Sequence, residues 1–247
     1  NPTWSFYFRH VIQELKRSHR VIAYDHLGSG LSSKPQCYNY CLEQHIKNLD
    51  QFIKRLKLDH VTLLVHDWGG AIGLGWATRN RHKLKRLIIS NTAAYLSQDI
   101  PKRIALLKTP FIGEFLIRQL NVFAKSALVM ASHNKLSSEA KKGLIQPYNS
   151  FKNRIGIARF VQDIPTRTKH PSYQTLAKIE QQLPQITCPT LILWGMNDFC
   201  FHRGFLKKWQ SIYPKANTVE YHQASHYLFE DVPNEINSEI KTFMSQS

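Results

Sequence analysis

Five short apolar runs rich in β-branched and aromatic residues are spaced along the chain, and helical patterns separate them. Near-continuous apolar runs of this length are typical of strands buried in a parallel sheet. The runs are RVIAYD (20–25), HVTLLVHD (60–67), LKRLIIS (84–90), PTLILWG (189–195) and TVEYHQ (218–223). In residues 40–58, Leu42, Ile46, Leu49, Ile53 and Leu56 recur at steps of four and three, and Ile236, Ile240 and Phe243 do the same near the end of the chain. The alternation predicts a parallel sheet with helices on both faces.

The interval 93–184 breaks this alternation, because it contains no strand pattern. Its apolar residues follow helical spacing instead, as in RIALLKTPFIGEFLIRQLNVFAKSALVM and NRIGIARFVQDI. An insertion of this size between two strands predicts a helical cap over the carboxyl ends of the strands, where doubly wound sheets bind ligands. We therefore expect an α/β core formed by 1–92 and 185–247, and a helical cap formed by 93–184.

Composition narrows the class of protein. The chain has 247 residues, 43% of them hydrophobic, and no apolar run approaches the roughly 18 residues that a membrane span needs. Its four cysteines do not form a disulfide framework or a pattern of zinc ligands, so we expect reduced thiols, a cytoplasmic location, no metal and no cofactor. The net charge of +16 is spread along helices, which argues against nucleic acid as a partner and leaves peripheral membrane association open.

The stretch VTLLVHDWGGAIGLGWA (61–77) contains the first candidate for chemistry. An apolar run ends on Asp67, and Gly69 and Gly70 follow at once. A carboxylate at the end of a buried strand is costly unless something pairs with it or uses it. A strand, a tight turn and a glycine-rich helix start form a nucleophile elbow, here with Asp in the usual place of serine. A simple helix N-cap is the alternative role for Asp67.

Two further residues complete a candidate triad. Asp198 follows the run PTLILWG, and His226 follows the run TVEYHQ. Nucleophile, acid and histidine in this chain order, each after a strand, predict the catalytic triad of the α/β-hydrolase fold. A carboxylate nucleophile is already charged, so Asp67 would form an ester or anhydride directly, and His226 would serve a later proton or water step.

Several segments resemble known families of this fold. The segments VHDWGGAIG, NPTWSFYFR and DHLGSGLSSKP resemble the haloalkane dehalogenases. A closer resemblance extends through the cap: SNTAAY, LNVFAKSALVMA, PYNSFKNRIGIARFVQDIP, HPSY and WGMNDFCF are similar to the β-lactone decarboxylases of long-chain olefin biosynthesis, the OleB family. This resemblance covers nearly the whole chain. It implies conversion of a cis-β-lactone with two long alkyl chains into a cis-alkene and carbon dioxide.

The resemblance also implies roles for individual residues. Asp67 would be the nucleophile, His226 the base and Asp198 the acid. Trp68 and Asn1 would hold the lactone oxygens, since indole and amide N–H groups are hydrogen-bond donors. Attack of Asp67 on the carbonyl and attack on the ring carbon bearing oxygen are both compatible with these residues.

The long-chain substrate predicts an apolar tunnel between cap and core. We expect Phe115, Phe123 and Met130 to line it, because each buried methylene of the substrate gains roughly 0.8 kcal/mol. Other enzymes of olefin biosynthesis are candidate partners. The alternatives are a haloalkane dehalogenase or other hydrolase with the same triad, and an inactive remnant.

The resemblance has one departure. Proteins of this fold have strands and a His-Gly pair before the NPTW segment, whereas this sequence begins at Asn1. We therefore expect the N-terminal strands to be missing from this chain and one side of the sheet to be bare, with unpaired backbone groups.

Overall fold

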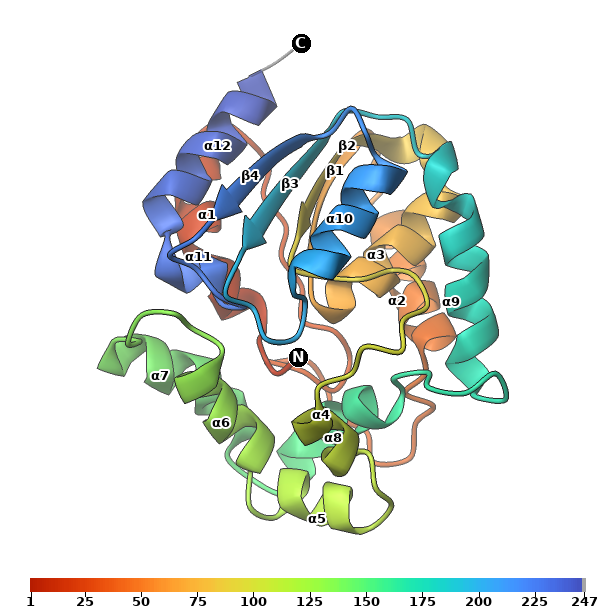
Figure 1. The fold of residues 1–247 in the computed structure, drawn as a ribbon, viewed down its shortest axis with the longest axis vertical. Coiled ribbons are helices and arrows are strands. Elements are labelled where there is room, and N and C mark those ends of the chain that lie inside the picture. Colours follow the sequence, from red (N-terminus) through yellow and green to blue (C-terminus); the bar gives the residue numbers. More distant parts are fainter. Residues whose placement is uncertain (246–247) are drawn as a thin grey trace.

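The computed structural model describes residues 1–245 and contains one parallel sheet (Figure 1). The strands lie side by side in the order β1-β2-β3-β4, and every pair among them is parallel. Their bounds are β1 (Val61–His66), β2 (Leu84–Ser90), β3 (Thr190–Gly195) and β4 (Asn217–Tyr221). Four of the five strands expected from the sequence are therefore confirmed. Their carboxyl ends lie at one edge of the sheet, which brings the polar residues that follow them together.

Helices cover both faces of the sheet, as the alternation of apolar runs predicts. One face packs against α2 (Leu42–Arg55), α3 (Trp68–Arg79), α9 (Pro171–Gln182) and α10 (Arg203–Ile212). The apolar stripe of α2 points inward, with Leu42, Ile46, Leu49 and Ile53 buried. Burial of that stripe, rather than the intrinsic helix preference of the sequence, stabilises such a helix.

The other face packs against the two ends of the chain. Here lie η1 (Ser5–Phe8), α1 (Arg9–Leu15), α11 (Leu228–Asp231) and α12 (Pro233–Ser245). Successive residues of a strand point to opposite faces of the sheet. Accordingly, Ile88 and Leu191 contribute to this second core, whereas Ile89 and Ile192 contribute to the first. The expected doubly covered sheet is confirmed.

The regular elements of the interval 93–184 are all helices, joined by loops, and no strand occurs in it. After η2 (Arg81–Lys83) and β2 come α4 (Lys102–Leu107), α5 (Ile112–Arg118), α6 (Val122–Met130), α7 (Ser138–Ile145), η3 (Gln146–Tyr148), η4 (Lys152–Arg154), α8 (Ile155–Gln162) and, after α9, η5 (Leu183–Gln185). Helices α4 to α8 lie beyond the carboxyl ends of the strands (Figure 1). Helix α9 packs instead on α2 and α3 beside the sheet. The division into core and cap at residues 93 and 184 stays a prediction.

One expected strand is wrong: residues 20–25 form no strand. In the part of the chain that the structure describes, β1 pairs only with β2. A cavity of about 740 Å³ lies between β1 and the 20–25 segment, lined by Val21, Tyr24, Leu63 and Val65 among others. Because that cavity separates the 20–25 segment from β1, no ladder of hydrogen bonds forms there, and its apolar residues alone do not make a strand.

Candidate active site

Asp67 occupies a strained turn between β1 and α3. Its backbone has φ +49° and ψ −129°, a region that non-glycine residues rarely adopt and that is typical of functional turns. The turn is fixed by its neighbours: the Asp67 N–H donates to the carbonyl of Asn91 at 3.1 Å, and the Thr92 hydroxyl donates to the carbonyl of Asp67. Gly70 is needed for this approach, because a Cβ atom there would lie 1.9 Å from Thr92 Oγ1.

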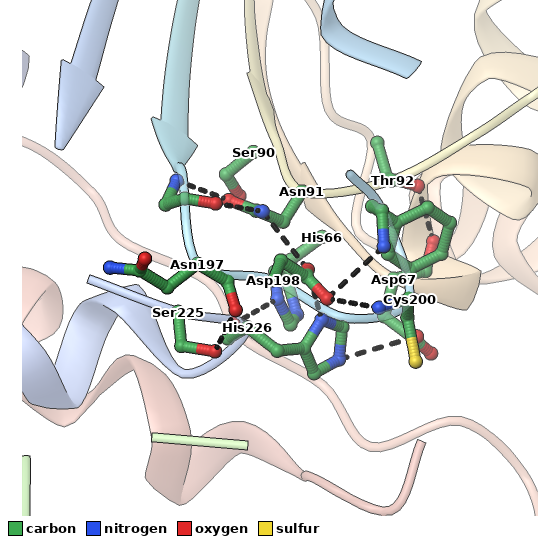
Figure 2. A network of polar contacts seen from close by, with 12 residues as sticks. His66, Asp67, Ser90, Asn91, Thr92, Asn197, Asp198, Cys200, Ser225 and His226 are labelled. Atoms are coloured by element: carbon green, nitrogen blue, oxygen red, sulfur yellow. Dashed lines mark hydrogen bonds and ion pairs between the residues drawn. The ribbon is translucent and has the colours of Figure 1, made fainter. Parts of the chain in front are cut away.

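The structure brings together the three residues of the predicted triad (Figure 2). His226 Nδ1 lies 2.8 Å from Asp198 Oδ2, and His226 Nε2 lies 3.5 Å from Asp67 Oδ2. All three come from segments that directly follow β1, β3 and β4, as expected from the sequence. The imidazole is thus held between two carboxylates, one that orients it and one that occupies the elbow.

The charges of this cluster favour an ionised nucleophile. Burial raises the pKa of the Asp67 carboxyl, but neighbouring charges, among them the His226 imidazole, outweigh burial and lower that pKa. Burial opposes a charged His226, yet the Asp198 carboxylate raises the pKa of the imidazole above its usual value. The pKa of Asp198 is lowered, because His226 and the N–H groups of Phe201 and Cys200 outweigh its burial. Asp67 is therefore a carboxylate at neutral pH.

Asn91 is a site residue that the sequence reasoning missed. It is fully buried at the end of β2, where its Nδ2 donates to Asp198 Oδ2 at 2.9 Å and to the carbonyl of Gly195 at 3.0 Å. The Gly195 N–H donates back to Asn91 Oδ1 at 2.7 Å. Asn91 therefore orients the acid of the triad. A polar residue directly after an apolar strand, the signal that identified Asp67, was present here as well.

His66 was also missed, although it precedes Asp67. Its Nε2 lies 2.9 Å from the backbone carbonyl of His226, and the Tyr7 hydroxyl donates to the same carbonyl at 3.1 Å. Burial lowers the pKa of His66 to about 3, so its ring is neutral at ordinary pH and can donate through Nε2. The side chains of His66 and Tyr7 thus hold the backbone carbonyl of His226, while Asp198 holds its ring.

Trp68 and Asn1, predicted to hold the lactone oxygens, both lie beside Asp67. Trp68 is the first residue of α3, and its ring lies 5.2 Å from that of Phe160 on α8. The backbone nitrogen of Asn1 lies 2.6 Å from Asp67 Oδ1. The side-chain amide of Asn1 donates to the carbonyl of Ile157 at 3.4 Å, so it points toward the cap. Their role in holding oxygen atoms stays a prediction.

The three predicted substrate contacts lie in the cap. Phe115 on α5 is 56% exposed, and Phe123 on α6 is partly buried against the apolar cluster inside the cap. Met130, the last residue of α6, is half-buried, and its sulfur accepts a hydrogen bond from Arg103 at 3.4 Å. A role of these side chains in binding alkyl chains stays a prediction.

A loop of the cap is hydrogen-bonded to both sides of His226. The loop follows α6, and the carbonyl of Ala131 accepts from the N–H of Tyr227 at 2.6 Å. The Asp231 carboxylate makes the other connection: it accepts from Ser132 Oγ at 2.5 Å and from the N–H of Ser225 at 2.9 Å. It also accepts from the N–H groups of His133 and Asn134. Four donors therefore share this one carboxylate.

Residues 1–245 contain neither a cluster of metal ligands nor a membrane-spanning helix. No group of three or more His, Cys, Asp or Glu side chains is arranged there to hold a metal ion. No helix in the same range is long and apolar enough to cross a membrane.

Comparison with known proteins adds a second kind of observation. A family model described as the alpha/beta hydrolase fold matches residues 1–233. The chain is 38% identical to a cis-3-alkyl-4-alkyloxetan-2-one decarboxylase from Shewanella oneidensis, over all of this chain and 80% of that protein. It is 34% identical to a protein of the same name from Xanthomonas campestris, over all of this chain and 86% of that protein.

Haloalkane dehalogenases are more distant relatives. Haloalkane dehalogenase 2 from Mycobacterium tuberculosis is 26% identical, over 97% of this chain and 84% of that protein. The crystal structure of the haloalkane dehalogenase DatA from Agrobacterium tumefaciens superposes with a TM-score of 0.90 at 25% identity, covering 99% of this chain and 86% of that one. The chain belongs to the α/β-hydrolase fold and, within it, to the family of the cis-3-alkyl-4-alkyloxetan-2-one decarboxylases.

Proposed function

We propose that this protein is a carbon–carbon lyase that converts cis-3,4-dialkyl β-lactones (oxetan-2-ones) into long-chain cis-alkenes and carbon dioxide. One observation carries the proposal: an ionised Asp67 stands on the elbow, 3.5 Å from His226, in a chain 38% identical over its whole length to a named oxetan-2-one decarboxylase. A carboxylate there supports covalent catalysis that needs no prior deprotonation of the nucleophile.

In the first step, Asp67 attacks the ring carbon that bears oxygen. The bond from this carbon to the ring oxygen breaks, its electron pair leaves with the oxygen, and an alkyl ester of Asp67 with a free β-carboxylate results. Attack on the carbonyl would instead give an anhydride and a β-alkoxide. An alkene could then form only by expelling a strongly basic oxygen, which is a poorer leaving group than a carboxylate. We therefore favour attack on the ring carbon.

In the second step, the bond between the α-carbon and the carboxylate breaks and carbon dioxide leaves. The electron pair of that bond forms the double bond and expels the Asp67 carboxylate, which regenerates the enzyme. Attack inverts the ring carbon, so an anti elimination is needed to keep the two alkyl chains on the same side. Inversion followed by anti elimination gives the cis-alkene from the cis-lactone.

The surrounding residues support these steps without taking part in the bond changes. The N–H donors of Trp68 and Asn1 stabilise the lactone oxygens as charge develops. The alkyl chains lie against Phe115, Phe123 and Met130, so affinity for lactone analogues rises with alkyl length. The cap excludes water from the intermediate. If water entered, His226 would activate it, and the ester would be hydrolysed to a hydroxy acid. Contact with other enzymes of olefin biosynthesis belongs to the same proposal.

A hydrolase is the second candidate function, and one observation favours it. His226 Nε2 faces the Asp67 carboxylate, the position from which an imidazole activates water against an ester on that carboxylate. In a haloalkane dehalogenase or another hydrolase of this fold, that water step would release the product. The two functions therefore differ in how the covalent intermediate breaks down, not in how it forms.

The test offers the purified protein a synthetic cis-3,4-dialkyl β-lactone and, in parallel, a 1-haloalkane. Alkene should form from the lactone, and it should be lost in Asp67→Ala and Asp67→Asn. Hydroxy acid from the lactone in place of alkene, or rapid halide release without alkene formation, would establish the hydrolase instead. Thr92→Ser, which keeps the hydroxyl that supports the elbow, serves as the control for general effects of substitution near Asp67.

A further inference from the structure

The outer surface of the cap exposes an unusual number of large apolar side chains. Ten large hydrophobic residues of the described chain are exposed, and seven of them lie between residues 106 and 151. The most exposed in the cap are Phe111 at 90%, Val129 at 77%, Ile112 at 61%, Leu106 at 57% and Phe115 at 56%. A soluble protein rarely exposes large apolar side chains in such groups unless that surface binds a partner or a membrane.

These side chains belong to neighbouring helices. Ile112 and Phe115 lie on α5, and Phe111 directly precedes this helix. Helix α5 contacts α4, which bears the exposed Leu106. The end of α6, which bears Val129, is joined to α4, because Arg103 donates to the sulfur of Met130. In Figure 1, α5 lies at the end of the molecule farthest from the sheet, and α4 and α6 lie between it and the carboxyl ends of the strands. We call Leu106, Phe111, Ile112 and Val129 the cap apolar face.

The same region is strongly basic. Residues 101–154 contain ten Lys and Arg and only two acidic residues, so their net charge of +8 is half of the +16 of the whole chain. Lys102 and Arg103 are exposed on α4, Lys125 on α6 and Lys152 on η4. A protein partner could cover an apolar face whether the residues around that face were basic or acidic. A combination of exposed aromatic and aliphatic side chains with a basic surround is the composition that binds anionic lipid.

We propose that the cap apolar face and its basic surround dock this protein on an anionic lipid surface. Phe111 and Ile112 enter the boundary between headgroups and acyl chains, and the exposed lysines and arginines neutralise lipid phosphates. The proposal rests on exposure and charge rather than on the reaction, so it can fail while the proposed function stands. It deepens that function in one respect: the cap, beneath which Asp67 lies, would face the medium in which long-chain molecules dissolve.

Vesicle co-sedimentation tests the proposal with two lipid mixtures, one of phosphatidylcholine with 30% phosphatidylglycerol and one of phosphatidylcholine alone. Binding should be at least tenfold stronger to the anionic vesicles and should weaken between low and high salt. The apolar variant Leu106→Ser/Phe111→Ser/Ile112→Ser should lose at least tenfold in binding. Ile22→Ser/Leu31→Ser, which removes exposed apolar side chains outside the cap, should bind normally. Phe115 is left unchanged because it is a proposed substrate contact.

A second matched pair of variants tests the basic residues around the cap apolar face. Lys102→Glu/Arg103→Glu/Lys125→Glu should abolish binding to anionic vesicles. Lys57→Glu/Lys207→Glu/Lys215→Glu changes the net charge equally at exposed positions outside the cap and should reduce binding much less. Equal losses in both sets would mean that total charge alone attracts the protein, which overturns a specific face. Absence of vesicle binding together with a dimer that the apolar variant abolishes would assign the face to a second copy and overturn the lipid proposal.

Discussion

Asp231 accepts a hydrogen bond from the backbone N–H of Ser225, the residue before His226, at 2.9 Å. The same carboxylate holds three consecutive residues of the cap, Ser132, His133 and Asn134. The cap and the loop that bears His226 are therefore fixed to one side chain at the end of α11. A displacement of the cap loop would be transmitted to the imidazole, whose Nε2 lies 3.5 Å from Asp67.

Asp231→Asn should reduce turnover and change the products. The amide keeps the size of the side chain but turns an N–H₂ group toward backbone N–H donors. It therefore loses hydrogen bonds either to the cap loop or to the loop that bears His226. Misplacement of a reacting group by about 1 Å can cost on the order of 100-fold in rate. Because the cap would also admit water, we expect the ratio of hydroxy acid to alkene to rise. Product ratios measured by gas chromatography check this.

Glu230→Gln provides the matched control. Glu230 neighbours Asp231 on α11 and is buried, but it pairs with Arg9 and not with the cap loop. It should retain the product ratio of the unchanged protein. Ser132→Ala, which removes one of four donors to Asp231, should give an intermediate ratio if Asp231→Asn folds poorly. An unaltered product ratio in Asp231→Asn and Ser132→Ala would show that the contacts of Asp231 with the cap loop stabilise the fold without affecting the reaction.

The sequence was sufficient to predict the elements whose burial leaves a periodic pattern of apolar residues within one segment. The strands β1 to β4 and the stripe of α2 could be predicted because burial on a sheet and along a helix face leaves a periodic signal. The segment 20–25 has the same kind of signal but forms no strand, since a strand also needs a neighbour. No pattern within a segment reports whether its partner is adjacent, and this is why the prediction failed there.

The site was predicted unevenly for a related reason. Asp67, Asp198 and His226 could be found because each follows a strand, and parallel strands end at one edge of the sheet. The roles of Asn91, His66 and Asp231 depend on contacts between segments far apart in the chain, such as Asn91 and Asp198, which are 107 positions apart. The sequence shows polar residues at these positions without showing which groups they contact.

Gly70→Ala should damage the elbow, whereas Gly69→Ala should not. A Cβ atom at position 70 would lie 1.9 Å from Thr92 Oγ1, the hydroxyl that donates to the carbonyl of Asp67. A Cβ atom at position 69 meets nothing within 4 Å. Overpacking of this kind costs about 1–3 kcal/mol, so urea denaturation should show that loss for Gly70→Ala together with a fall in kcat. Equal behaviour of the two variants would contradict this account of the elbow.

Asp163 is a buried carboxyl that joins the end of α8 to the start of α2. Its Oδ2 accepts from the N–H of Leu42 at 2.8 Å, and both of its oxygens accept from Ser172 Oγ. Burial raises the pKa of Asp163 to about 6, although these hydrogen bonds and Lys108 oppose the rise. The raised pKa means that the folded protein holds a proton on this group at pH values where the unfolded chain has lost it.

This proton gives Asp163 a stability contribution with a defined sign. A carboxyl whose pKa is raised by folding stabilises the protein below its unfolded pKa, and that contribution is lost as the pH rises through the folded value of about 6. Asp163→Asn resembles the protonated form and does not titrate. Relative to the unchanged protein, the free energy of unfolding of this variant should therefore increase by about 2 kcal/mol between pH 4.5 and pH 7.5. Urea denaturation at the two pH values measures this difference, with exposed Asp59→Asn as the control; a difference that is constant with pH would show that Asp163 does not carry the proton.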